Sequence, residues 1–260
     1  MSSSPDPTEH PPYDQTAEWY DAIYQAKGRD CALEIQRISH HWSGDGCTSE
    51  SRRILDAGCG SGAHLSALGA HGRVTGVDQS AAMLEMAARR RASHQLFQSD
   101  LLELDLEDRF DLVVSLFGVC GYLADRAQLH SALSRLGRHV LPGGTLLVEP
   151  PLLAENFQAP RRAYVETRLG ASTLSRSTNS RRVGTHLELE FEWRQRFDEA
   201  ASDDRLIRER HRMLLLSSEA WLDVATAALG GRFEVRIDPE GPIGRGLLVA
   251  ISLDGVRGSG

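Results

Sequence analysis

The sequence predicts an α/β fold with an open, mostly parallel, doubly wound sheet and an antiparallel accessory layer. Two observations predict the sheet: short apolar runs alternate with helix-like stretches, and a glycine cluster directly follows the first of these runs. A third observation predicts the accessory layer, because residues 151–212 are polar, rich in arginine and alternate in hydrophobicity. Leu187, Leu189, Phe191 and Trp193 fall on one face of that alternating pattern.

Local patterns predict the elements in order. Residues 16–41 carry apolar side chains at helical spacing, interrupted at Gly28, and predict two short helices. Ser80 is placed to cap a helix over 81–91, and Ser218 begins an amphipathic helix that reaches Leu229. The expected parallel strands cover 53–57, 74–77, 95–98, 112–117 and 145–148, and the two closing strands cover 233–237 and 246–251.

This order of elements predicts one domain with an insertion. Residues 1–14 are polar, acidic and rich in proline, so we expect a disordered tail there. Residues 15–150 and 213–253 are expected to form the domain that carries the large sheet. Residues 151–212 are expected to form an inserted antiparallel cover.

Composition excludes several classes of partner. The 260 residues are 41% hydrophobic, enough for a sizeable core. With 29 Lys+Arg against 36 Asp+Glu, a net charge of −7 and no basic stripe, we expect no nucleic-acid partner. No apolar run approaches the ~20 residues of a membrane span. Four cysteines without a CxxC pair favour a reducing, cytoplasmic location, and the scattered histidines predict no metal site.

The glycine cluster between the first strand and the next helix predicts a ligand site. Gly58, Gly60 and Ala63 fit the G-x-G-x-x-A pattern of nicotinamide enzymes, and Asp78 lies 78 − 58 = 20 residues after Gly58. Asp56, two residues before Gly58, would repel a pyrophosphate. The full pattern Asp56-x-Gly58-x-Gly60-x-Gly62 suits a ligand with a cationic amino-acid end instead.

Two more acids follow the next two strands. Asp78 can accept both hydroxyls of a ribose, and Asp100 is placed to accept an adenine amino group. The alternative is that each acid caps the helix that follows it. Leu141-Pro142-Gly143-Gly144 then turns sharply into the fifth strand.

These four loops, in this order, resemble those of the class I S-adenosylmethionine-dependent methyltransferases, whose fold is Rossmann-like. The resemblance implies that S-adenosyl-L-methionine is the cofactor and S-adenosyl-L-homocysteine the product. It extends the cofactor-binding set beyond Asp56, Gly58, Gly60, Gly62, Asp78 and Asp100 to Tyr20, Arg29, Cys59, Gln79, Leu101 and Leu116.

Both ends of the chain show a finer resemblance. Residues 19–30 and 241–247 are similar to the opening and closing segments of the N,N-dimethyltransferases that act on nucleotide-linked amino sugars in antibiotic biosynthesis. With Val148-Glu149-Pro150, the similarity runs from Tyr20 to Ile251 and is patchy over the insertion. It implies a small-molecule amine as acceptor, with the insertion covering the acceptor site. Relatives are often dimers, so the resemblance leaves a homodimer open.

The same resemblance implies the acceptor residues. Tyr24 would face the amine, and Arg245 would meet the phosphates of a nucleotide sugar. Tyr24, Tyr122 and Glu149 form the catalytic set, with Glu149 as a proton relay, and Phe117 joins them in binding the acceptor. Arg161, Arg162 and Arg176 are expected on the solvated surface.

Two departures from the family pattern concern the acceptor. Tyr122 stands where relatives place a histidine, and a neutral phenol is a poor base near pH 7, so we expect an orienting hydrogen bond from it. Pro151-Leu152-Leu153 replaces aromatic residues suited to stacking a base, which weakens the case for a thymidine nucleotide. Two alternatives stay open: an O- or carboxyl-methyltransferase, and a non-catalytic module that binds S-adenosylmethionine.

Overall fold

The computed structural model describes residues 11–42, 48–90, 95–158, 161–198 and 204–254. It contains a seven-stranded sheet in the order β10-β11-β5-β4-β1-β2-β3. Its strands are β1 (Arg53–Ala57), β2 (Arg73–Asp78), β3 (Gln95–Gln98), β4 (Phe110–Ser115), β5 (Val140–Val148), β10 (Phe233–Asp238) and β11 (Leu247–Ser252). β1 to β5 are parallel, and β11 runs against both of its neighbours. The predicted open, mostly parallel sheet is confirmed.

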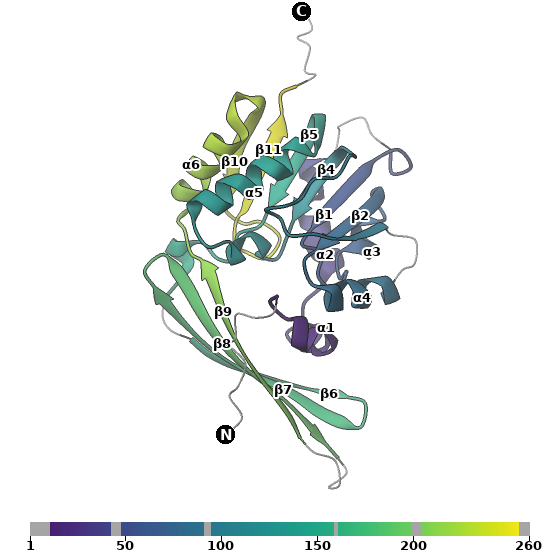
Figure 1. The fold of residues 1–260 in the computed structure, drawn as a ribbon, viewed down its shortest axis with the longest axis vertical. Coiled ribbons are helices and arrows are strands. Elements are labelled where there is room, and N and C mark those ends of the chain that lie inside the picture. Colours follow the sequence, from purple (N-terminus) through teal and green to yellow (C-terminus); the bar gives the residue numbers. More distant parts are fainter. Residues whose placement is uncertain (1–10, 43–47, 91–94, 159–160, 199–203, 255–260) are drawn as a thin grey trace, which may run out of the picture.

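Helices cover both faces of this sheet (Figure 1). They are α1 (Ala17–Ala26), α2 (Cys31–Ile38), α3 (Leu65–Leu68), α4 (Ala81–Arg90), α5 (Arg126–Arg138) and α6 (Ser218–Leu229), with short 3₁₀ turns at Asp14–Thr16, Ser39–His41, Val119–Tyr122, Ala154–Asn156 and Gly230–Arg232. Along the described residues, no helix is long and apolar enough to cross a membrane.

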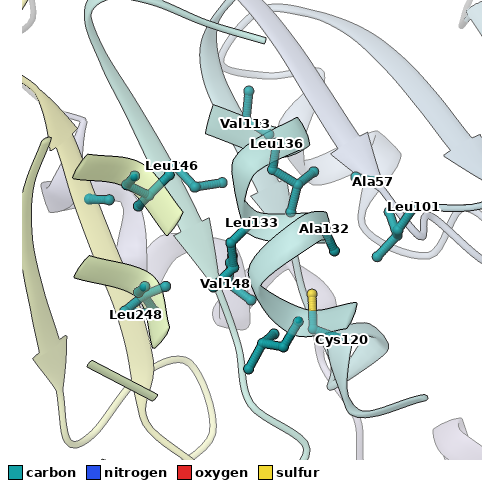
Figure 2. Close-up of a cluster of buried hydrophobic side chains, with 14 of the residues drawn as sticks. Ala57, Leu101, Val113, Cys120, Ala132, Leu133, Leu136, Leu146, Val148 and Leu248 are labelled. Carbon is teal, nitrogen blue, oxygen red and sulfur yellow. The ribbon is translucent and has the colours of Figure 1, made fainter. Parts of the chain in front are cut away.

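Successive side chains of each inner strand point to opposite faces of the sheet, so the same strands contribute to two core layers. On one face, Val113, Leu146 and Leu248 pack against α5 and α6 (Figure 2). On the other face, Leu112 and Leu147 pack with residues of α2, α3 and α4. Because the inner strands are buried on both sides, their sequences are continuous apolar runs rather than alternating ones.

The fifth strand begins earlier than predicted. Phe110 pairs with Val140 and Leu112 with Thr145, so the register shifts between these pairs and Leu141-Pro142-Gly143-Gly144 lies inside β5 as an irregularity. Gly144 cannot carry a side chain without strain, because a Cβ there would lie 2.8 Å from the carbonyl oxygen of Asp111. The sharp turn expected before the strand is therefore a bulge within it.

Residues 161–214 contain the second sheet, a four-stranded antiparallel meander that we call the cover sheet. Its strands are β6 (Arg161–Leu169), β7 (Ser172–Val183), β8 (His186–Phe197) and β9 (Arg205–Leu214), so β9 passes the expected boundary at residue 212. Figure 1 shows it extending from the larger sheet with α1 beside it. Trp19 and Ile23 of α1 pack against Leu174, Phe191 and Trp193.

The first described residues correct the predicted tail. Residues 1–10 lie outside the described residues, but residues 11–14 are ordered, so the prediction of a tail was wrong for that part. The ring of Tyr13 packs 5.0 Å from that of Tyr20 and 4.6 Å from that of His211, measured between centroids. Asp14 accepts a hydrogen bond of 2.6 Å from the Ser80 hydroxyl.

Candidate active site

A cavity of about 370 Å³ lies where the carboxyl ends of β1, β2 and β4 meet α1 and the cover sheet. A smaller cavity of about 110 Å³ adjoins it and shares Gly58, Asp78 and Tyr122 with it. Nearly all residues that the sequence singled out line one of the two. The larger is lined by Tyr20, Tyr24, Arg29, Gly58, Cys59, Gly60, Asp78, Gln79, Leu116, Phe117, Tyr122 and Arg245, and the smaller also by Asp100 and Leu101.

A third hollow, of about 540 Å³, lies between α5 and the end of α6. None of the predicted site residues lines it, so we place the chemistry in the first two cavities.

The glycines of the loop are required for a left-handed backbone conformation and, at Gly58 and Gly62, for close packing as well. Gly58 has φ +83°, and a Cβ on it would lie 2.4 Å from Cγ1 of Val119. Gly60 has φ +54° with nothing within 4 Å of a Cβ, so its backbone faces the open cavity. A Cβ on Gly62 would press on Ala87 at 3.0 Å, so this glycine permits close packing on α4. Gly62 therefore supports the loop without lining the cavity.

Asp78 connects the loop to the second strand. Its Oδ2 accepts a 2.8 Å hydrogen bond from the Gly60 amide, and its Oδ1 accepts one of 2.9 Å from the Ser80 amide. Each carboxylate oxygen has a second lone pair, which leaves Asp78 able to accept two hydroxyls as well. The cap of α4 is Ser80, whose Oγ accepts from the Met83 amide, as predicted.

Asp100 lies one strand further along the same edge. Its Oδ1 accepts a 2.6 Å hydrogen bond from the Leu102 amide, so the carboxylate is held in place at the wall of the smaller cavity. This arrangement fits the predicted adenine contact.

Asp56 lies beneath the loop, outside the cavity lining, and is 1% exposed. Its Oδ2 has no hydrogen-bond partner. Burial and the Asp78 charge raise the pKa of Asp56 to about 7, partly opposed by Arg29. A buried carboxylate oxygen without a partner is costly, and an ammonium group of a ligand would satisfy it. The residues present therefore fit the amino-acid end of S-adenosylmethionine.

Arg29 is held at the cavity by a cluster that the sequence reasoning missed. Its Nε donates to Glu34 at 3.3 Å, and Glu34 also accepts a 2.6 Å hydrogen bond from His64. Burial would raise the pKa of Glu34, but the hydrogen bond from His64 and the charge of Arg29 lower it. Cys31, Glu34 and His64 lie close enough to hold a metal ion, yet Glu34 and His64 are engaged with each other. The absence of a metal site stays a prediction.

Tyr24 lies at the centre of the acceptor side. Its Oη is 3.4 Å from that of Tyr13, and the Arg176 guanidinium lies 4.9 Å from its ring centroid. Burial would raise the pKa of Tyr24, but the Arg176 charge and hydrogen bonds from Tyr13 and Arg176 lower it. A lowered pKa makes the phenol a stronger hydrogen-bond donor, so Tyr24 can donate to the lone pair of a neutral amine.

Arg176 corrects the expectation of a solvated side chain. It is 3% exposed and lines the cavity, where its Nε and Nη1 have no partner. Its guanidinium also lies 4.7 Å from the Phe191 ring and 4.9 Å from the Trp193 ring. The expectation was wrong because Arg176 shares the inward face of β7 with Leu174. Arg161 and Arg162 are exposed, although Arg161 reaches the edge of the cavity.

Phe117 occupies a strained turn directly after β4. Its φ is +60°, which is rare for a large side chain. The ring lies between two cations, 3.6 Å from the Arg29 guanidinium and 5.0 Å from that of Arg245. Glu149 holds the turn, since its Oε2 accepts a 2.7 Å hydrogen bond from the Phe117 amide.

Glu149 itself is fully buried and does not line the cavity. Burial raises its pKa to about 7, against the opposing charge of Arg245. Its Oε1 has no partner. The contact that the structure shows for Glu149 is with the backbone of Phe117, and its catalytic role stays a prediction.

The remaining residues that sequence reasoning missed come from the N-terminal segment and the cover sheet. Tyr13, Lys27 and Arg176 line the larger cavity. His211 lies behind it, 2.8 Å from the Tyr122 hydroxyl. The two-residue alternation of the insertion held the signal for Arg176 and His211, because both share a face with buried apolar residues.

Comparisons with known proteins show which family the chain resembles. Residues 54–144 match the model of a methyltransferase domain. The chain is 34% identical, over 94% of its length and 92% of the relative's, to the dTDP-3-amino-3,6-dideoxy-alpha-D-glucopyranose N,N-dimethyltransferase of Streptomyces fradiae. It is 31% identical, over 90% of its length and 97% of the relative's, to the dTDP-3-amino-3,4,6-trideoxy-alpha-D-glucopyranose N,N-dimethyltransferase of Streptomyces venezuelae.

Solved structures show the same likeness. DesVI of Streptomyces venezuelae superposes with a TM-score of 0.81 at 29% identity, covering 91% of this chain and 98% of that one. CalS10, an amino pentose methyltransferase of Micromonospora echinaspora solved with S-adenosylmethionine bound, gives 0.77 at 28% identity, covering 90% and 96%. The fold and the loops at its sheet edge define a class I S-adenosylmethionine-dependent methyltransferase. Within that class, the chain belongs to the family of the amino-sugar N,N-dimethyltransferases.

Proposed function

We propose that this enzyme transfers methyl groups from S-adenosylmethionine to the amine of a nucleotide-linked amino sugar in natural-product biosynthesis. The observation that carries the proposal is the pairing of two unsatisfied groups at one site. Beneath the glycine loop lies the unpartnered Oδ2 of Asp56, and across the cavity Nε and Nη1 of the Arg176 guanidinium have no partner. The first suits a cationic cofactor, and the second suits an anionic acceptor.

On the cofactor side, the chain supplies binding and alignment. Asp56 and Arg29 would hold the amino and carboxylate ends, Asp78 the ribose and Asp100 the adenine. When bound, S-adenosylmethionine supplies a methyl group already activated by a sulfonium. The protein therefore has to hold the acceptor in line, keep water out and present the amine uncharged.

On the acceptor side, Tyr24 and Tyr122 would orient the amine, and the inserted residues 151–212, which carry most of the cover sheet, would cover it. Lys27, Arg176 and Arg245 gather positive charge around the cavity: burial lowers the pKa of Lys27, and the charges of both arginines lower it further. Such a cluster favours a ligand with diphosphate charge over a neutral sugar. Leu152 lies in the wall where a base would stack, so we propose no particular base.

A methyl-transfer assay tests the proposal. Labelled S-adenosylmethionine is supplied with a free amino sugar, its nucleotide-linked form and a panel of hydroxyl and carboxylate compounds. We expect labelling of the nucleotide-linked amine. Labelling of only a hydroxyl or carboxylate compound would select the O- or carboxyl-methyltransferase alternative, and failure to bind the cofactor in calorimetry would refute the whole assignment.

Arg176→Met tests the charge argument within that assay. Methionine roughly keeps the volume and removes a buried charge whose Nε and Nη1 have no partner, so the fold is not expected to suffer. We expect KM for the nucleotide-linked acceptor to rise by about tenfold or more, with an unchanged Kd for S-adenosylhomocysteine. Arg162→Met, on the exposed side of β6, is the matched control and should leave both constants at wild-type values.

We also propose a cytoplasmic location and retain the homodimer as a proposal. Cys31, Cys59 and Cys120 are free thiols, which supports a reducing compartment. Sedimentation velocity of the purified chain tests the dimer, and a single monomeric species across micromolar concentrations would rule it out.

A further inference from the structure

A hydrogen-bonded chain of side chains leads from the cavity into the cover sheet. Tyr122 lines both cavities, and its hydroxyl lies 2.8 Å from Nδ1 of His211 on β9. Nε2 of the same ring lies 3.4 Å from Oε2 of Glu209. Glu209 is fixed in turn, because its Oε2 accepts from Trp193 at 2.9 Å and its Oε1 accepts from Thr16 at 3.0 Å.

This arrangement sets the protonation pattern of the imidazole. A carboxylate can only accept, so Glu209 favours a proton on Nε2 and leaves the lone pair on Nδ1. Nδ1 then faces the phenol hydroxyl of Tyr122 as a proton acceptor. His211 is 6% exposed, so water does not compete freely for that contact.

We propose that Tyr122, His211 and Glu209 form a proton relay that removes the proton from the acceptor amine. The inference rests on the proposed function, since the amine must be neutral before each methyl transfer. Tyr122 Oη takes the proton as the N–H bond breaks, and its own proton passes to Nδ1 of His211. The imidazolium so formed is stabilised by Glu209 and returns its proton to solvent between turnovers.

The relay explains how a phenol can stand in a position where it would be a poor base alone. Burial raises the pKa of Tyr122 well above its ordinary value, so the free phenolate is not formed. A concerted transfer through the hydroxyl avoids that charge, because oxygen gains one proton as it loses another. Tyr122 is then a catalytic residue, and His211 and Glu209 are positioning and proton-accepting residues behind it.

The groups around the relay define its pH behaviour. Glu209 faces His211 from its own strand, Tyr13 from the N-terminal segment and Tyr122 from the turn after β4. Tyr24 on α1 and Arg176 on β7 act on Tyr122 through space. A protonated imidazole has no free lone pair with which to accept from Tyr122, so the relay requires a neutral His211 before each transfer.

The experiment compares His211→Asn, Tyr122→Phe and the double variant across pH 6–9. Asparagine can hydrogen-bond near the Nδ1 position but cannot accept a proton. We expect each single variant to lose about 10²-fold in kcat at pH 7 with unchanged KM for the cofactor, and the double variant to lose no more than either single one. The loss should shrink at high pH, where the amine deprotonates unaided.

His186→Asn is the matched control, a buried histidine on β8 that bonds the Ala124 carbonyl and lies outside the cavity. It should keep wild-type kcat. Losses that multiply in the double variant, or a wild-type pH profile for His211→Asn, would overturn the relay. Should His211→Asn fail to fold by thermal unfolding, Tyr122→Phe decides: unchanged kcat and pH profile overturn the relay.

A second measurement is independent of the acceptor. Nitrogen-15 NMR of histidine-labelled wild-type protein should show His211 protonated on Nε2, with an Nδ1 shift that changes in Tyr122→Phe. Protonation on Nδ1 instead would overturn the proposal whatever substrate the enzyme accepts. If wild-type enzyme labels no amine while NMR shows the expected tautomer, the proposed function fails rather than the geometry of the relay.

Discussion

Asp56→Asn should have two separate effects: it should remove a pH-dependent loss of stability, and it should weaken cofactor binding. In the wild-type protein, burial and the neighbouring Asp78 raise the pKa of Asp56 from 3.8 to about 7, against the opposing charge of Arg29. The folded state holds the Asp56 proton more tightly than the unfolded state does. The stabilisation that protonated Asp56 contributes is therefore fully present below about pH 4 and is lost as pH rises through 7. Asparagine does not titrate, so this loss should disappear in the variant.

The magnitude follows from the width of the window. Each pH unit in which only the folded state holds the proton is worth ~1.36 kcal/mol, so ionising Asp56 between pH 5 and pH 7 costs roughly 3 kcal/mol. The variant should therefore gain stability relative to wild type by about that amount between pH 5 and pH 8. For a chain of this size, that corresponds to roughly 6–12 °C in the difference of Tm.

Thermal unfolding at pH 5 and pH 8, with and without S-adenosylhomocysteine, measures both effects. The ligand should stabilise wild type by mass action and leave Asp56→Asn almost unchanged. Glu103→Gln, which removes one negative charge at an exposed position outside both cavities, is the control. Parallel pH dependences of Tm in wild type and Asp56→Asn would refute the reasoning, because they would show that Asp56 ionises without cost in the folded chain.

Two further predictions concern the cofactor edge. Asp78→Ala should weaken S-adenosylhomocysteine binding by about 10²-fold in calorimetry, because charge-assisted hydrogen bonds are lost, whereas Tyr122→Phe should change it less than about threefold; the reverse order would mean that the two sides of the pocket are exchanged. Gly58→Ala should destabilise the protein by about 2–4 kcal/mol in chemical denaturation, since it adds left-handed strain to a clash with Val119 at 2.4 Å. Gly28→Ala has the same sign of φ without a clash and should cost about 1 kcal/mol; equal losses would contradict the packing argument.

The cofactor edge could be predicted because its signals are local. Gly58, Asp78 and Asp100 each follow a strand that the apolar pattern marks, and parallel strands bring such positions to one edge. The class of the protein followed from those few positions. The bulge within β5 could not be predicted in the same way, because Pro142 and Gly143 interrupt the apolar run although the backbone continues to pair on either side.

The acceptor side depends on contacts between distant segments. Arg176 looks like any arginine on a polar strand until β8 and α1 surround it with aromatic rings. The hydrogen-bond partner that gives His211 its proposed role is Tyr122, which lies 89 residues away in sequence. Likewise, the left-handed turn at Phe117 is stabilised by Glu149 from the neighbouring strand, and no local pattern marks it. Composition and periodicity predict which residues are buried, but they do not predict which functional side chains from distant segments contact one another.

The hairpin turns of the cover sheet determine which of its side chains line the cavity. Leu169 pairs with Ser172 and Val183 with His186, so two-residue turns that begin at Gly170 and Gly184 fix the pairing of β6 to β8. Both glycines have positive φ, as tight hairpins require. A slip of one residue would turn the inward positions outward and bring the Arg and Glu residues of the opposite face into the cavity. Gly170 and Gly184 therefore help to determine which side chains face the cavity, although neither glycine lines it.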